Sequence, residues 1–351
     1  MTPVSLTSLA LSSPPHILDQ EDVIDLCRDL YGNRPAFFEK MQTAYRNAGI
    51  KQRRSCVPID WYREPHGWRE RNDLYVENAL AILEEAGRQT IEEAGLAPED
   101  IDSVVCISTT GLSTPSLEAR LIGRLGLKNS VRRLPIFGLG CAGGVVGMAR
   151  AADLARAWPG SRVLVLVVEL CALTFRPQDT SKANVIASAL FGDGAAAAIL
   201  QSGETDGEPI LTFGAIAEHT WPEDDQVMGW TIEEDGFGVL FSRDIPNIVG
   251  TRLRPLLERF LADNDLDWNA LDGFVLHPGG AKVLEAYADA IPVPADDLRR
   301  GADILEYSGN MSAVTVLAVL RRTIDEGAGG KRLMVGLGPG FSVGMGLLDF
   351  A

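Results

Sequence analysis

Apolar side chains alternate between helical spacing and short continuous runs along this chain. Residues 75–95 place apolar side chains at helical spacing and end at Gly95, a residue type that often closes a helix. Residues 101–108 form a short apolar run, and 162–170 are dominated by Val and Leu without polar alternation. Strands of that kind are buried on both faces of a sheet. The pattern therefore predicts an α/β fold with helices on both faces of a central sheet.

A similar order of elements recurs later in the chain. A short strand at 134–137 and a helix at 141–158 precede the strand at 162–170. The second part predicts a helix, a strand, two helices and a strand, in that order, at 248–264, 271–280, 281–290, 311–327 and 332–340. This repetition predicts an internal duplication of βαβα units.

The duplication has a predicted boundary and matching landmarks. The polar, glycine-containing stretch 201–208 separates the halves, so we expect them to be residues 1–205 and 206–351. Cys141 stands at the front of the long helix of the first half, and Asn310 stands at the front of the corresponding helix of the second. The first half therefore carries the cysteine, and the second carries the asparagine.

Net charge excludes several classes of partner. The chain has 48 acidic and 32 basic residues, which gives a formal charge of −16. General nucleic-acid binding relies on Lys and Arg neutralising phosphates, so a chain this acidic is a poor candidate for it. Repulsion from anionic membrane surfaces follows from the same charge. An anionic substrate would need a local patch of basic residues to overcome it.

Cysteine spacing and hydropathy indicate the compartment. The five cysteines include no Cys-x-x-Cys pair, which argues against a disulfide scaffold and against a zinc knuckle. No basic segment precedes an apolar run at the N-terminus, so a secretory signal is not expected. The strongest apolar run, 163–168, is far too short to span a bilayer. We therefore expect a cytoplasmic protein with no membrane span and no metal site.

Cys141 is the first candidate for chemistry. It follows a Gly-Leu-Gly turn at 138–140 and begins a predicted helix. The partial positive charge at a helix N-terminus favours a thiolate. The small residues at 142–144 are expected to leave room for a substrate. The alternative is a small buried cysteine at a close-packed helix start.

His277 and Asn310 are the other candidates. His277, one of four histidines, ends a predicted strand. Ligands of α/β sheets bind beyond the carboxyl ends of strands. Asn310 lies just before a predicted helix. Each has an ordinary alternative, because a strand-end histidine often bonds to the backbone and asparagine is a preferred helix cap.

The duplication joins the three residues in one hypothesis. If the halves face each other, the two helix N-termini converge with His277 nearby. A thiolate can accept an acyl group. Histidine and asparagine can donate hydrogen bonds to a thioester oxygen that becomes enolate-like when a malonyl group loses CO₂. The set therefore favours carbon–carbon bond formation on thioesters, with no metal or other cofactor.

A papain-like hydrolase uses the same three residue types. Around its nucleophile, however, the pattern Cys-Gly-[Ser/Ala]-Cys-[Trp/Tyr] is expected. This chain has Gly-Cys-Ala-Gly at 140–143 instead. A duplicated α/β chain is also the wrong scaffold for that class.

Five ordered segments resemble those of the type III polyketide synthases, the chalcone-synthase-like family. They are residues 139–144, 190–195, 277–280, 308–312 and 336–340. The resemblance covers the chain from about residue 20 onward. It implies a thiolase-type αβαβα fold, a homodimer, and acyl-CoA and malonyl-CoA substrates used without an acyl carrier protein. Carried over by position, it also implies that Cys141 bears the acyl group, while His277 and Asn310 drive malonyl decarboxylation and stabilise the oxyanion.

The resemblance also implies residues around a cavity. Phe191 is similar to the family's gatekeeper between the CoA tunnel and the cavity. The second gatekeeper, a Phe in the plant enzymes, falls at Val239, so a wider or differently shaped mouth is expected. Further cavity-lining positions are Thr110, Thr114, Glu169, Cys171, Thr174 and Ser312. Thr114-Pro115 resembles the segment that reaches into the partner's active site, where a cis bond is implied. Ordinary core or loop roles are the alternative for each.

A basic stretch is the expected entry for CoA. Residues 40–54 contain five cations and no acid, an inversion of the chain's overall charge. They match the family's phosphate- and adenine-binding segment. The expected CoA contacts are Lys40, Arg46, Lys51 and Arg53, together with Gly279 and Gly280. A solvated helix face is the alternative.

The amino-acid sequences of two segments favour one subgroup of the family. Residues 228–230 and 235–237 resemble bacterial members, in particular those that make alkylpyrones and alkylresorcinols from long fatty-acyl starters. Naphthalene-type synthases fit less well, because they carry additional cysteines in the segment that matches 169–175, where this chain has only Cys171. The expected reaction is condensation of malonyl-CoA onto an acyl-CoA starter, followed by closure to a pyrone or phenolic ring.

Two other hypotheses stay open. One is a different thiolase-fold condensing enzyme, either the ketoacyl-carrier-protein synthase that starts fatty-acid chains or hydroxymethylglutaryl-CoA synthase. The segments 190–195 and 336–340 favour the polyketide synthase over both. The other is a catalytically silent relative used for binding, against which the complete Cys, His and Asn set argues.

Overall fold

A long mixed sheet is the framework of the protein. The computed structural model describes residues 2–205 and 207–351, and within them nine strands form this sheet. Their order across it is β11 (Gly273–Leu276), β12 (Gly330–Gly338), β13 (Ser342–Phe350), β8 (Leu211–Thr220), β1 (Val4–Ser12), β7 (Asp193–Ser202), β6 (Arg162–Leu170), β4 (Ser103–Ile107) and β5 (Arg132–Ile136). Two separate pairs are β2 (His16–Asp19) with β3 (Gln52–Ser55), and β9 (Met228–Glu233) with β10 (Gly236–Phe241).

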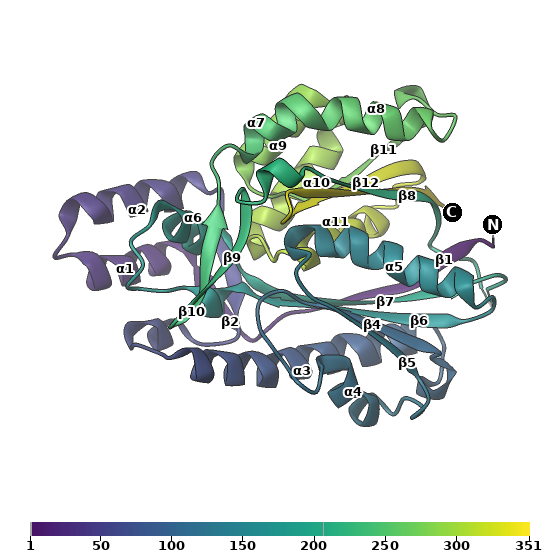
Figure 1. Ribbon diagram of the computed structural model, residues 1–351, viewed down its shortest axis with the longest axis horizontal. Coiled ribbons are helices and arrows are strands. Elements are labelled where there is room, and N and C mark those ends of the chain that lie inside the picture. Colours follow the sequence, from purple (N-terminus) through teal and green to yellow (C-terminus); the bar gives the residue numbers. More distant parts are fainter. Residues whose placement is uncertain (1, 206) are drawn as a thin grey trace.

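Helices and strands alternate in layers in the order α, β, α, β, α (Figure 1). The central layer contains α5 (Gly143–Ala157) and α11 (Ala313–Asp325), which lie between the two halves of the sheet. One outer layer contains α3 (Trp68–Glu93) and α4 (Leu117–Leu125), and the other contains α8 (Arg254–Ala262), α9 (Ala281–Ala290) and α10 (Ala295–Ser308). The remaining helices are α1 (Gln20–Tyr31), α2 (Pro35–Asn47), α6 (Lys182–Leu190) and α7 (Ile245–Ile248).

Strand pairing confirms the predicted duplication. Strand β4 is parallel to β6, β6 is antiparallel to β7, and β7 is antiparallel to β1. Strands β11, β12, β13 and β8 repeat this series of one parallel and two antiparallel pairs. A short pairing of β1 with β8, at Ser5 with Thr212 and Leu6 with Leu211, joins the two halves. The expected boundary at 205/206 includes residue 206, which lies outside the described residues, so that boundary stays a prediction.

Glycines in α5 allow the two central helices to touch. A Cβ atom added to Gly144 would lie 2.3 Å from the carbonyl oxygen of Ala313 in α11. One added to Gly147 would lie 2.7 Å from Ile107 in β4. The expectation that the glycine beside Cys141 leaves room for a substrate is therefore wrong for Gly144. The missing side chain is needed for close helix packing, which brings the N-termini of α5 and α11 together.

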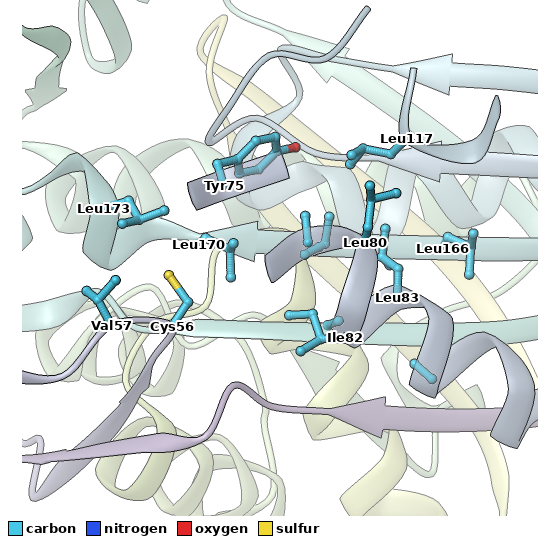
Figure 2. Packing of buried hydrophobic residues seen from close by; sticks show 14 of the residues in the cluster. Cys56, Val57, Tyr75, Leu80, Ile82, Leu83, Leu117, Leu166, Leu170 and Leu173 are labelled. Carbon is cyan, nitrogen blue, oxygen red and sulfur yellow. The ribbon is translucent and has the colours of Figure 1, made fainter. Parts of the chain in front are cut away.

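The apolar core follows the layers. The outer face of the first half packs α3 against β6, with Leu80 and Leu83 in the same buried cluster as Leu166 and Leu170 (Figure 2). The inner faces of both halves enclose the central helices. Because β6 is covered on both faces, its residues after Arg162 are all buried, as its continuous apolar pattern predicts.

Several predicted elements differ in extent. The helix predicted at 75–95 begins earlier, at Trp68. The strand predicted at 271–280 ends at Leu276, so His277 follows it directly. The helix predicted at 248–264 is interrupted, because a π-helical turn, Val249–Leu253, separates α7 from α8.

Two further features bear on the expected class of protein. Within residues 2–205 and 207–351, no helix combines the length and apolar character needed to cross a membrane. In the same part of the chain, no three His, Cys, Asp or Glu side chains are arranged to hold a metal ion.

Candidate active site

Cys141 lies in a tight turn at the start of α5. The turn is the short helix η3 (Gly140–Ala142), which continues into α5. Gly140 has φ +48°, and a Cβ atom there would lie 2.6 Å from Pro339. A Cβ atom on Gly338 would lie 2.5 Å from the carbonyl oxygen of Leu139. The glycines of segments 139–144 and 336–340 therefore allow the end of β12 to pack directly against the cysteine turn.

Asn310 meets Cys141 from the opposite half. The Cys141 Sγ lies 3.9 Å from Asn310 Oδ1 and 3.6 Å from Ser312 Oγ. The same Oδ1 accepts hydrogen bonds from the Ser312 backbone N–H at 2.8 Å and from Thr315 Oγ1 at 3.3 Å. Asn310 thus behaves in part as the helix cap considered above, while its side chain also contacts the thiol. The convergence of the two helix N-termini, expected from the duplication, is present.

His277 is buried and free for a ligand. Its side chain is 1% exposed, and both ring nitrogens lack a hydrogen-bond partner among the described residues. Buried polar groups are normally paired, so two unpaired nitrogens need an explanation. The backbone, not the ring, makes the local bonds, with His277 N–H donating to Val335 O at 2.9 Å. Asn310 Nδ2 donates to Gly279 O at 3.3 Å and so ties the histidine segment to the asparagine.

Burial shifts the pKa of both the histidine and the cysteine. Burial lowers the pKa of His277 to about 4, so the ring is neutral at pH 7. Burial also raises the pKa of Cys141 to about 12, and the nearby Glu169 carboxylate adds to the rise, while the side-chain contacts with Ser312 and Asn310 oppose it. Burial of the thiol and the helix N-terminus thus act on the pKa of Cys141 in opposite directions, and the expected thiolate stays a prediction. Attack by Cys141 requires a proton acceptor, and neutral His277 has the chemistry of one.

Glu169 supports the cysteine through Ser312. At the end of β6, Glu169 Oε2 accepts hydrogen bonds from Thr109 N at 3.0 Å and Thr110 Oγ1 at 2.9 Å. Its Oε1 lies 3.4 Å from Ser312 Oγ. Burial raises the pKa of Glu169 to about 7. Ser312 has φ +50°, an uncommon backbone conformation for a residue with a side chain, and it places Oγ between the carboxyl group and the thiol.

A largely apolar cavity lies beside this centre. Phe191 forms an isolated backbone bridge with Asn310 and also belongs to the lining of the cavity. Phe191, Val239, Cys171 and Thr174 line this cavity, which is partly open to solvent. It extends toward α1 and α2, where its lining includes Leu18, Val23, Leu26, Cys27 and Tyr45. Four of the residues expected around a substrate cavity thus share one space.

A second cavity begins at the same place. It encloses about 310 Å³, and Thr110 and Thr174 belong to its lining, so Thr174 borders both cavities. Its other walls are more polar and include Arg71, Asn72, Arg176 and Asp235. The sequence analysis missed these side chains. The sequence offered one signal for the polar wall. Arg71 and Arg176 are basic residues in an acidic chain, and Arg176 lies two positions after the expected cavity residue Thr174.

Thr114 is separate from both cavities. It is exposed on the surface, and its peptide bond to Pro115 is cis, as the resemblance implies. It belongs to the lining of neither cavity in the described part of the chain. A contact with substrate would require a second copy of the chain, and that role stays a prediction.

One of the expected CoA contacts is wrong. Arg53 is 3% exposed, and its guanidinium donates to the carbonyl oxygens of Ser188 at 2.6 Å and Phe191 at 3.1 Å, and to Gln20. It holds the chain behind Phe191 and cannot meet a phosphate in solvent. The cause lies in strand β3, whose alternating side chains point Arg53 inward.

The other expected CoA contacts are accessible to different degrees. Lys40 and Arg46 are exposed on α2. Lys51 is exposed but forms an ion pair with Glu306 and lies over the Tyr307 ring, 5.4 Å from its centroid. Gly279 and Gly280 are partly buried between His277 and α9. The cationic entry is thus smaller than the sequence pattern predicts.

Comparison with known proteins assigns the family. Residues 3–204 match the N-terminal domain of chalcone and stilbene synthases, and residues 214–349 match their C-terminal domain. The chain is 36% identical over 346 residues to 1,3,6,8-tetrahydroxynaphthalene synthase of Streptomyces peucetius subsp. caesius, covering 96% of this chain and 90% of that protein. It is 35% identical over 353 residues to a putative chalcone synthase of Bacillus subtilis (strain 168), covering 96% of each.

Comparison with solved structures agrees with this family assignment. The crystal structure of 1,3,6,8-tetrahydroxynaphthalene synthase from Streptomyces coelicolor A3(2), described as a bacterial type III polyketide synthase, matches with a TM-score of 0.92 at 28% identity over 99% of each chain. Layers, duplicated halves and a buried cysteine between them define a thiolase-like condensing enzyme. The chain belongs to the chalcone and stilbene synthase family. It is a type III polyketide synthase and therefore an acyltransferase, which decides against the two other thiolase-fold enzymes considered above.

Proposed function

We propose that the chain condenses malonyl-CoA onto an acyl-CoA starter with a long apolar chain and closes the product to a pyrone or phenolic ring. The apolar cavity that runs from Phe191 and Cys171 toward α1 is the observation that carries the proposal. Burial of apolar surface stabilises a complex by roughly 25 cal/mol per Å². A fatty-acyl tail would gain that stabilisation in such a lining, whereas a short polar starter would not.

Loading needs a nucleophile and a proton acceptor. The Cys141 thiol attacks the thioester carbonyl carbon of the starter, its proton passes to neutral His277, and the bond between that carbon and CoA sulfur breaks. The CoA thiolate leaves and takes up the proton. The acyl group is then bonded to Cys141 Sγ, beside the mouth of the apolar cavity.

Extension of the acyl chain uses hydrogen-bond donors from the protein and needs no metal ion. His277 and Asn310 Nδ2 would donate to the thioester oxygen of malonyl-CoA and stabilise the negative charge that develops there as CO₂ leaves. The present bond from Asn310 Nδ2 to Gly279 O is long, 3.3 Å, and a substrate oxygen can replace it. The resulting carbon nucleophile attacks the acyl carbonyl and releases Cys141. No acyl carrier protein and no cofactor besides the CoA thioesters enter this scheme.

A homodimer is part of the proposal. Leu112, two residues before Thr114, is 45% exposed, and Phe137, just after edge strand β5, is 55% exposed. Exposed apolar side chains of this size support a contact with a second copy of the chain. That contact would cover them and bring Thr114 toward the partner.

The starter can be tested by shortening the apolar cavity. The variant Leu26→Phe adds bulk to the α1 wall. We expect the ratio of kcat/KM for a long-chain acyl-CoA to that for acetyl-CoA to fall about tenfold, in line with the effect of small steric changes in apolar pockets. The measurement is steady-state kinetics over a ladder of starters from acetyl to long-chain. The control is Asp22→Phe on the exposed face of the same helix, and equal ratios in the two variants would contradict the proposal.

A second candidate comes from the relatives. The naphthalene product named for one of them carries no alkyl tail, so its formation needs no long starter. Only one cysteine of this chain, Cys171, lies in the segment 169–175, where naphthalene-type synthases were expected to carry more. Incubation with malonyl-CoA alone separates the two functions. An aromatic product without an alkyl chain, formed faster than any product from a fatty-acyl starter, would favour the naphthalene reaction.

CoA entry can be tested at α2. Lys40 and Arg46 have no ion pair among the described residues, and they are the accessible cations of the basic stretch. The double variant Lys40→Gln/Arg46→Gln is expected to raise KM for CoA substrates about fivefold with little change in kcat, because the charges assist binding rather than chemistry. The increase should shrink at high ionic strength. The control is Arg259→Gln on α8, and an unchanged KM in the double variant would leave the stretch as ordinary surface.

A further inference from the structure

The β9–β10 hairpin covers both cavities. It is a separate two-stranded sheet, and among the described residues it forms no ladder with the main sheet. Val239 of β10 lines the apolar cavity, while Gly236 and Phe237 line the polar one. The position of this hairpin therefore sets the shape of both spaces.

An ion pair holds the turn of the hairpin. Arg176 Nε and Nη2 each lie 2.8 Å from Asp235 Oδ1, at the residue that joins β9 to β10. The Arg176 side chain is 16% exposed and also lies 3.4 Å from Asp179 through Nη1. The Asp235 side chain is 45% exposed, and two charge-assisted bonds from one guanidinium hold its carboxylate more strongly than bonds between neutral groups would.

The loop that carries Arg176 is itself fixed. Arg71 of α3 donates through Nη1 to the carbonyl oxygens of Leu173 and Phe175, both at 2.7 Å. Leu173 and Thr174 belong to η4 (Cys171–Thr174), which borders both cavities. Arg176 thus connects the segment that Arg71 holds to the turn of the hairpin. Trp68 adds an edge contact to Phe237, with ring centroids 5.8 Å apart.

The charge of the neighbouring residues favours the ion pair at this turn. Glu233, Glu234 and Asp235 are three consecutive acids, and like charges at adjacent positions repel. Of the three, Asp235 alone pairs with a guanidinium in the described part of the chain. Arg176 holds the pKa of Asp235 below its usual range, so the pair is charged at neutral pH.

We propose that the Arg176–Asp235 ion pair latches the β9–β10 hairpin over the polar cavity and thereby determines how many malonyl units the enzyme adds. The effect of the latch on product length rests on the proposed function, because the polar cavity is where an oxygen-rich growing chain would lie. Arg176 and Asp235 are positioning residues, since neither contacts Cys141, His277 or Asn310 in the structure. Opening the hairpin enlarges the polar cavity and admits a longer chain.

The test compares charge loss at the latch with charge loss beside it. In Asp235→Asn the hairpin should loosen, and backbone amides of β9 and β10 should exchange with deuterium about tenfold faster than in the wild type. The ratio of products with one additional malonyl unit to the principal product should rise about fivefold. Arg176→Gln should act in the same direction. Product ratios come from mass spectrometry of reactions with malonyl-CoA and one starter acyl-CoA.

Two control variants make the result decisive. Glu234→Gln removes the same charge from the same turn, but Glu234 is exposed and has no partner among the described residues, so exchange and products should match the wild type. Asp235→Glu keeps the carboxylate and should stay close to the wild type. Unchanged exchange or unchanged product ratios in Asp235→Asn, or an equal shift in Glu234→Gln, would overturn the latch. A wild-type enzyme without any polyketide product would instead contradict the proposed function, and the exchange comparison would still decide whether the ion pair holds the hairpin.

Discussion

Cys141→Ala is expected to abolish product formation, with a loss of about a thousandfold or more, because the variant lacks the thiol proposed to carry the acyl intermediate. Cys141 is the buried thiol that meets Asn310 and Ser312 between the two halves. Intact mass after incubation with an acyl-CoA should show one acyl adduct on the wild type and none on the variant. Steady-state product formation gives the second measurement.

The chain supplies a matched control for this experiment. Cys106 is equally buried but lies in β4, outside the lining of both cavities. Cys106→Ala should retain the adduct and most of the activity. An acyl adduct that persists in Cys141→Ala would assign the nucleophile to another cysteine. The absence of any adduct on the wild type would support a catalytically silent relative.

Removing the donors at Asn310 and His277 is expected to have the second-largest effect. Asn310→Ala should slow release of CO₂ from malonyl-CoA about a hundredfold, which is typical for the loss of one oxyanion donor. Loading of Cys141 should change much less, because Asn310 is not needed to accept the thiol proton. The measurement is labelled CO₂ release beside acyl-adduct formation in the same preparation.

The protonation state of His277 sharpens this prediction. A pKa of about 4 means that the ring is neutral throughout the physiological range and becomes charged only below that value. A neutral ring acts through one N–H donor, so His277→Gln, which keeps an N–H, should decarboxylate malonyl-CoA about tenfold faster than His277→Ala. Equal rates for the two variants would mean that the histidine does not donate to the thioester oxygen. Equal losses of loading and decarboxylation in Asn310→Ala would remove the asparagine from its specific role.

Much of the fold was visible in local patterns. Strands β4, β6 and β12 and helices α3, α5, α9 and α11 lie where the sequence predicts them. Strands of this kind are continuous apolar runs because both of their faces are buried. The duplication was also visible, since similar elements recur in the same order.

Strand β7 shows where local patterns fail. Its residues 195–198 are four consecutive alanines, a residue type that favours helices. The strand forms because β6 and β1 pair with it on both sides. Those partners are distant in sequence, so neither spacing nor composition within β7 could indicate them. Strands β1, β8 and β13 were missed for the same reason.

The sequence by itself determined the order of the duplicated elements and the chemical identity of Cys141, His277 and Asn310. Tertiary structure decided that Arg53 is internal, that burial raises the pKa of the Cys141 thiol, and that the glycine at 144 serves helix packing. It also decided that Arg176 and Asp235 form an ion pair in the wall of the polar cavity. The physical reason is that periodicity and residue type are local properties, whereas burial, pairing and pKa depend on groups that come together only when distant segments pack.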